Sequence, residues 1–189
     1  MLNRGTREKP ELDTPVALSV DNLELYGTWR VRPAIARIGG SNRIVIMDKD
    51  NALHMYRQID DFNVEDMGKL RLTDGSQITG HNNAMESLGQ MGRGKLRFVD
   101  WDGDGALDIV AGNSEGRLLF FKNRGTNTEP DFARSEEVCA GGSPILLRPG
   151  YHVVQGPFEA SWGYLCPTVC DWNGDGLPDV VVSGSRAKF

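Results

Sequence analysis

The sequence predicts an all-β fold that is made of repeated units of short strands. Short apolar runs rich in Val, Ile, Leu and Phe alternate with glycine-containing segments, and 23 of the 189 residues are glycine, which is well above average usage. Several apolar runs are almost continuous, as expected for strands of a sheet that is covered on both faces. Parts of the sequence also repeat. We therefore expect many short strands joined by tight turns.

One stretch of the sequence occurs twice with small changes. LRFVDWDGDGALDIVAG at 96–112 is echoed by TVCDWNGDGLPDVVVSG at 168–184, and the first aspartates of the shared loop, Asp100 and Asp171, are 71 residues apart. Self-similarity of this kind indicates a repeat architecture. In the first copy the apolar runs predict strands at 96–101, 108–112 and 117–122.

Two weaker echoes extend the pattern. The sequence Asn-Arg-Gly-Thr occurs at 3–6 and again at 123–126, followed each time by a proline a few residues later. Residues 43–56 resemble 108–121, but the loop that precedes them, 39–42, has no carboxylate and is two residues shorter by this alignment. We therefore predict three blade-like units, and we expect the N-terminal residues before them to be the end of a further unit.

Blades that are buried on both faces are typical of a β-propeller, in which four-stranded sheets stack radially. Three units alone would leave open edges and unburied faces, which repeat proteins normally cap. We therefore expect an incomplete part of a larger propeller.

The composition excludes some classes of partner. The formal net charge is −5, and lysine and arginine are scattered without a basic stripe, so no nucleic acid is expected as a partner. No apolar run approaches the length of a membrane span, so no membrane insertion is expected in this segment.

The three cysteines leave the disulfide state open. Cys166 and Cys170 lie in one predicted strand, roughly 13 Å apart, which is too far for a disulfide. Cys139 could pair with either of them.

The repeated loop contains the candidate metal ligands of the sequence. In its first copy four carboxylates stand at positions 1, 3, 5 and 9, and a glycine follows the third where the chain must turn. These carboxylates are Asp100, Asp102, Asp104 and Asp108. They would repel one another without a cation, and Ca²⁺ suits them because it accepts six to eight oxygen ligands, including backbone carbonyls. The carbonyl of Ala106, at position 7, is the natural fifth ligand.

The second copy keeps the pattern but has Asn173 at position 3, so we predict weaker calcium binding in the second loop. Without metal, we expect the greater loss of stability in the first loop, which has four carboxylates. An EF-hand is excluded because position 12 is Ala111 or Val182 and the flanks read as strands. The alternative is that Asp-Gly and Asn-Gly only form hairpin turns. Two copies with the same four positions favour calcium over that alternative.

These two loops and their flanks resemble FG-GAP or VCBS-type repeats, which occur in the propellers of integrin α subunits and in many secreted bacterial proteins. The resemblance implies four-stranded blades of about 60 residues, usually seven to a propeller, with Ca²⁺ in the loop between the first two strands. It implies two metal sites. The ligands of the first would be Asp100, Asp102, Asp104, Ala106 and Asp108, and those of the second would be Asp171, Asn173, Asp175, Leu177 and Asp179.

The predicted division of the chain follows from these units. Residues 1–32 are the end of a preceding blade and a connection, 33–93 a degenerate blade without a calcium loop, 94–164 a blade with the first calcium loop, and 165–189 a truncated blade with the second.

Other residues have simpler explanations. Trp101 and Trp172 share one loop position, and we expect each to pack against the neighbouring blade. His54, His81 and His152 could act as general bases, but none has a recognisable partner pattern, and we predict neither catalytic residues nor an organic cofactor.

The function expected from the sequence is a calcium-stabilised, non-catalytic propeller module that binds a protein or polysaccharide ligand in a secreted, cell-surface or periplasmic protein. One alternative is part of a propeller enzyme similar to a polysaccharide lyase, although fold alone does not license that choice. Another is a structural spacer between flanking domains.

Overall fold

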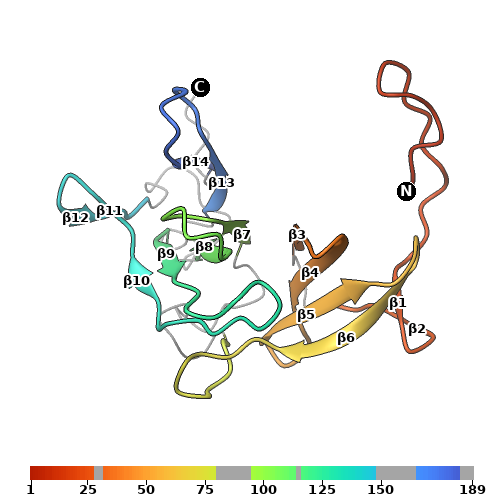
Figure 1. Cartoon of the computed structure of the whole chain (residues 1–189), viewed down its shortest axis with the longest axis horizontal. Coiled ribbons are helices and arrows are strands. Elements are labelled where there is room, and N and C mark those ends of the chain that lie inside the picture. The colour runs from red at the N-terminus through yellow and green to blue at the C-terminus, as the bar shows by residue number, and fades with distance from the viewer. Residues whose placement is uncertain (28–31, 80–94, 114–115, 148–164, 184–189) are drawn as a thin grey trace, which may run out of the picture.

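The computed structural model describes the chain except for residues 28–31, 80–94, 114–115, 148–164 and 184–189. The described residues form fourteen β-strands and contain no helix, so none of them belongs to a helix that could cross a membrane. The strands form several separate sheets, none of which closes on itself (Figure 1). The prediction of an all-β fold is confirmed, and the propeller arrangement of the sheets stays a prediction.

The first sheet is an antiparallel meander extended at one edge. Its strands are β3 (Ala34–Ile38), β4 (Ser41–Met47), β5 (Leu53–Gln58) and β6 (Asn63–Lys69), with β1 (Ser19–Val20) and β2 (Leu23–Glu24) at the outer edge. β1 pairs parallel with β6, although every other pair in the sheet is antiparallel.

The loop between β3 and β4 is shorter than the alignment predicted. Only Gly39 and Gly40 connect the strands, with φ of 57° and 83°, because Ser41 and Asn42 already pair with β3. Positive φ at both central residues is the geometry of a tight two-residue hairpin, which glycine adopts readily. The estimate of two missing residues was wrong: the equivalent connection of the second sheet is residues 100–107, and the first sheet has no room for an aspartate loop.

The second sheet contains β7 (Lys95–Val99), β8 (Asp108–Gly112), β9 (Leu118–Phe121) and β10 (Glu136–Glu137) in consecutive antiparallel order. These bounds agree closely with the three strands predicted from the apolar runs. Every residue of β8 is buried, as predicted for a strand that is covered on both faces.

Two short hairpins complete the described strands. One pairs β11 (Cys139–Ala140) with β12 (Ser143–Pro144), and the other pairs β13 (Cys166–Cys170) with β14 (Asp179–Ser183). All three cysteines are free.

A common core joins the first and second sheets. Side chains of β4 and β5 pack with those of β8 and β9, and the largest are fully buried, among them Met47, Leu53, Ile109 and Phe121. A second cluster on the other face of the first sheet is covered by residues beside β1 and β2. β7 contacts both β3 and β13, so the first strands of the three predicted units are neighbours. At Gly112 an added Cβ would lie 2.2 Å from the carbonyl oxygen of Leu165, so the backbones touch there.

The Asn-Arg-Gly-Thr echo is a structural repeat. In both copies the side-chain oxygen of the asparagine, Asn3 or Asn123, accepts hydrogen bonds from the backbone N–H groups two and eight residues further on. A hairpin with a two-residue turn of positive φ follows each copy sixteen residues later, as β1–β2 and β11–β12. The N-terminal segment and the segment after β9 therefore share one local design.

Candidate metal-binding loops

The first aspartate loop connects β7 with β8 and is held by its own carboxylates. The N–H of Gly105 donates to Asp100 Oδ2 at 3.0 Å, the N–H of Ala106 to Asp104 Oδ1 at 2.8 Å, and the N–H of Trp101 to Asp108 Oδ2 at 3.2 Å. Gly103 and Gly105 have φ of 75° and 87°, and glycine permits these values at little cost.

The second loop connects β13 with β14 and repeats the same three bonds. The N–H of Gly176 donates to Asp171 Oδ2 at 2.9 Å, that of Leu177 to Asp175 Oδ1 at 2.8 Å, and that of Trp172 to Asp179 Oδ2 at 2.9 Å. Its two glycines have φ of 79° and 85°. Both loops therefore fold to one backbone geometry from one spacing of aspartate and glycine.

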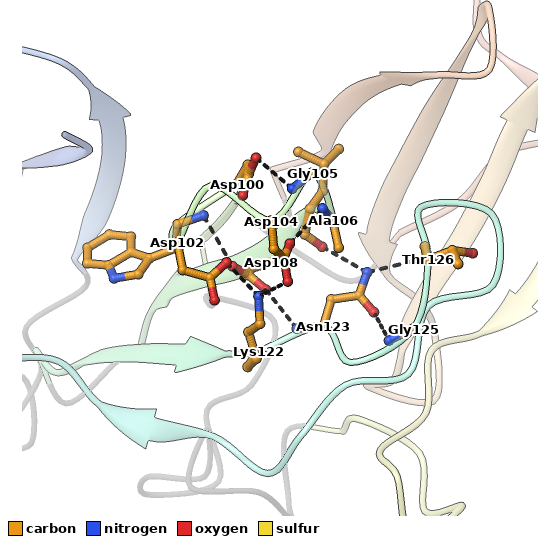
Figure 2. Close-up of polar contacts among 12 residues, drawn as sticks. Asp100, Asp102, Asp104, Gly105, Ala106, Asp108, Lys122, Asn123, Gly125 and Thr126 are labelled. Atoms are coloured by element: carbon orange, nitrogen blue, oxygen red, sulfur yellow. Dashed lines mark hydrogen bonds and ion pairs between the residues drawn. The ribbon is translucent and has the colours of Figure 1, made fainter. Parts of the chain in front are cut away.

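The first loop brings three carboxylates together. One oxygen each of Asp100, Asp102 and Asp104 lie within 4.8 Å of one another (Figure 2). Calcium–oxygen bonds are about 2.3–2.6 Å, so ligands of one ion lie at most about 5 Å apart, and this spacing fits. Asp100 Oδ1 is buried and has no hydrogen-bond partner, which is the condition of an acceptor that a cation would satisfy. These residues could hold a metal ion.

The other predicted ligands of the first loop are placed less directly. Asp108 is fully buried, and its second oxygen, Oδ1, accepts the N–H of Asn123 at 2.7 Å. Burial raises the pKa of this carboxyl against the opposing effect of its hydrogen bonds. The metal-ligand role of Asp108 and of the carbonyl of Ala106 stays a prediction.

In the second loop the predicted ligands contact one another. Asn173 Nδ2 donates to Asp175 Oδ2 at 2.9 Å, and Asn173 Oδ1 accepts the N–H of Asp175 at 3.0 Å. Asp171 Oδ1 accepts two backbone N–H groups. Leu177 is exposed. The five predicted ligands, Asp171, Asn173, Asp175, Leu177 and Asp179, stay predictions.

A lysine that the sequence did not single out reaches into the first loop. Lys122 follows β9, and its Nζ lies 2.7 Å from Asp102 Oδ1, 2.6 Å from Asp104 Oδ2 and 3.5 Å from Asp108 Oδ1 (Figure 2). Desolvation opposes the charged ammonium, but the bonds to Asp102 and Asp104 outweigh it and raise the pKa of Lys122. The Lys122 hydrogen bond, with that of a backbone N–H, lowers the pKa of Asp104.

Two asparagines clamp the first loop from the segment after β9. Asn127 accepts the N–H of Leu107 and donates to the carbonyl of Gly105, both at 2.7 Å. Asn123 donates through Nδ2 to the carbonyl of Leu107 at 3.2 Å. The Asn-Arg-Gly-Thr echo was the available signal for Asn123, but nothing in the sequence showed which loop the segment would contact.

The two tryptophans differ in their surroundings. The ring of Trp101 packs at 5.7 Å against Phe120 of its own sheet, and Trp172 is 77% exposed. The expectation that each packs on a neighbouring blade stays a prediction.

His54 forms a polar cluster apart from the loops. Its Nδ1 lies 3.1 Å from Asp48 Oδ2, its Nε2 lies 2.6 Å from Asp66 Oδ1, and its ring stacks on Tyr56 at 4.7 Å. Both ring nitrogens are engaged, so His54 links the β4–β5 turn to β6 rather than presenting a free nitrogen. His81 and His152 lie outside the described residues.

An all-β chain with two repeated aspartate loops is a repeat protein made of small sheet modules. The family model described as an FG-GAP-like repeat matches residues 100–182, which include both aspartate loops. The predicted resemblance is confirmed, and this part of the chain is FG-GAP-type repeat sequence. No curated protein matches the chain, and no solved structure matches it.

Proposed function

We propose that the chain is a calcium-stabilised module in which the loops at 100–108 and 171–179 each bind one Ca²⁺. The observation that carries the proposal is the shared geometry of the two loops: three equivalent hydrogen bonds in each hold the aspartates at positions 1, 5 and 9. In the first loop the gathered oxygens and the unpartnered Asp100 Oδ1 support a cation. Oxygen-only ligands in a flexible loop favour Ca²⁺ over Mg²⁺ or Zn²⁺.

The proposed role of the ion is structural. Each loop joins the first two strands of a sheet, and an ion that binds only the folded state stabilises it by mass action. The sheets are proposed to be blades of a β-propeller, and the neighbouring positions of β3, β7 and β13 support this arrangement because the innermost strands of adjacent blades lie together.

The module is proposed to present its loops to a protein or polysaccharide ligand in a secreted or cell-surface protein. FG-GAP repeats are typical of extracellular proteins, and millimolar extracellular calcium suits loops of modest affinity.

Calorimetric calcium titration of chelator-stripped protein tests the metal sites, together with thermal melts in calcium and in chelator. We expect two sites in the wild type, loss of one site in Asp104→Ala and of the other in Asp175→Ala, and a higher melting temperature with calcium. Asp61→Ala, which removes an exposed aspartate outside the loops, is the matched control and should keep both sites. A folded protein that shows neither calcium heat nor a shift in melting temperature would refute the proposal and leave the aspartates as turn formers.

A further inference from the structure

We infer that Lys122 competes with the metal in the first loop, so that calcium enters this loop by displacing the lysine ammonium. The inference rests on the proposed function and concerns the control of binding in the first loop.

The position of the ammonium supports competition. Lys122 Nζ is within hydrogen-bond distance of Asp102 and Asp104, two of the three carboxylates whose oxygens gather in the first loop. A cation held by these carboxylates and an ammonium at 2.6–2.7 Å from two of them repel each other and compete for the same negative charge. The ammonium therefore opposes the binding of a metal ion in this loop.

The structure also allows the lysine to leave. The side chain of Lys122 is 25% exposed, and the carboxylates of Asp102 and Asp104 are about half exposed, so the ammonium has a path to water. Lysine carries its charge on a flexible stem with rotatable donors and does not form the rigid fork of arginine. Calcium binding therefore costs the loss of these contacts.

The second loop has a weaker internal donor. Its carboxylates receive the neutral amide of Asn173, which donates to Asp175 at 2.9 Å. In the described part of the chain no lysine or arginine forms an ion pair with Asp171, Asp175 or Asp179. A neutral amide can turn its oxygen toward a cation, whereas an ammonium has no acceptor to offer.

The test isolates each loop in the full chain. Asp175→Ala leaves the first loop and Asp104→Ala leaves the second, and Lys122→Gln is added to each. We expect Lys122→Gln to tighten calcium binding about tenfold or more in the first background, since two charge-assisted contacts no longer have to be broken, and to leave affinity unchanged in the second. Lys122→Arg, which keeps a cation, should remain as weak as the parent.

A second readout separates competition from a general structural role. In chelator, Lys122→Gln should lower the melting temperature because the carboxylates lose their counter-ion. The rise in melting temperature from chelator to saturating calcium should be larger in Lys122→Gln than in the wild type. Calcium binding in the first loop that Lys122→Gln leaves unchanged or weakens overturns the inference alone. Absence of calcium heat in both backgrounds overturns the proposed function, and the inference falls with it.

Discussion

The repeat of the Asn-Arg-Gly-Thr segment provides a matched pair for measuring what burial adds to a hydrogen-bonded loop. Asn123 is 1% exposed, and its side chain makes four bonds to backbone groups at 3.0–3.3 Å. Asn3 makes the same two bonds through its oxygen and one weak bond through its amide, but it lies in solvent. Replacing each by alanine removes closely similar local contacts from a buried and from an exposed site.

The expected magnitudes differ because water can replace only the exposed contacts. Asn123→Ala removes four part-buried hydrogen bonds, and at about 1 kcal/mol for each lost bond the unfolding free energy should fall by about 2–4 kcal/mol. Asn3→Ala should cost less than about 1 kcal/mol, since its partners are hydrated after the change.

Urea denaturation in chelator measures both variants against the wild type, with the midpoint shift converted through a common slope. A second consequence is specific to Asn123. Its side chain donates to the carbonyl of Leu107 in the first loop, so calcium binding in that loop should weaken in Asn123→Ala and stay unchanged in Asn3→Ala. Equal losses of stability in the two variants would refute the reasoning, because the repeat would then stabilise only through its local bonds.

Two further predictions concern packing and acid stability. Phe132→Ala should lower the unfolding free energy by about 3–5 kcal/mol, since its ring is fully buried in the common core. Leu12 occupies the equivalent position of the first copy and is exposed. Leu12→Ala should therefore lower the unfolding free energy by less than about 1 kcal/mol in the same urea assay. Burial opposes the Asp48 carboxylate, but hydrogen bonds from the backbone and from His54 outweigh it and lower the pKa of Asp48. A lowered pKa contributes stability that is present above the unfolded pKa of about 4 and is lost as pH falls through the folded pKa. Asp48→Asn should therefore reduce the fall in melting temperature below about pH 4. A melting temperature that falls as steeply with pH as in the wild type would contradict this.

The two tryptophans show what a repeated loop position leaves undetermined. A shared position in a repeated loop fixes the backbone, but the neighbour that a side chain meets depends on which sheet lies beside it. Trp101 finds Phe120 in its own sheet, and Trp172 finds none in the described part of the chain.

The sequence by itself determined the all-β class, the main strands and the geometry of the aspartate loops. These features depend on residues close together in the chain: the apolar runs specify strands, and glycines at positions 4 and 6 of each nine-residue loop permit the positive φ that folds the carboxylates inward. The two copies confirm this because they form the same bonds in different surroundings.

The tertiary structure alone decided which groups meet these loops and cover these strands. Lys122 and Asn127 reach the first loop from 14 and 19 residues beyond Asp108, and Phe132 pairs with Leu72, 60 residues earlier in the chain. β1 pairs parallel with β6, across more than forty residues. Such contacts depend on how the sheets pack and on where each strand ends. The spacing of residues within one repeat predicts neither of these.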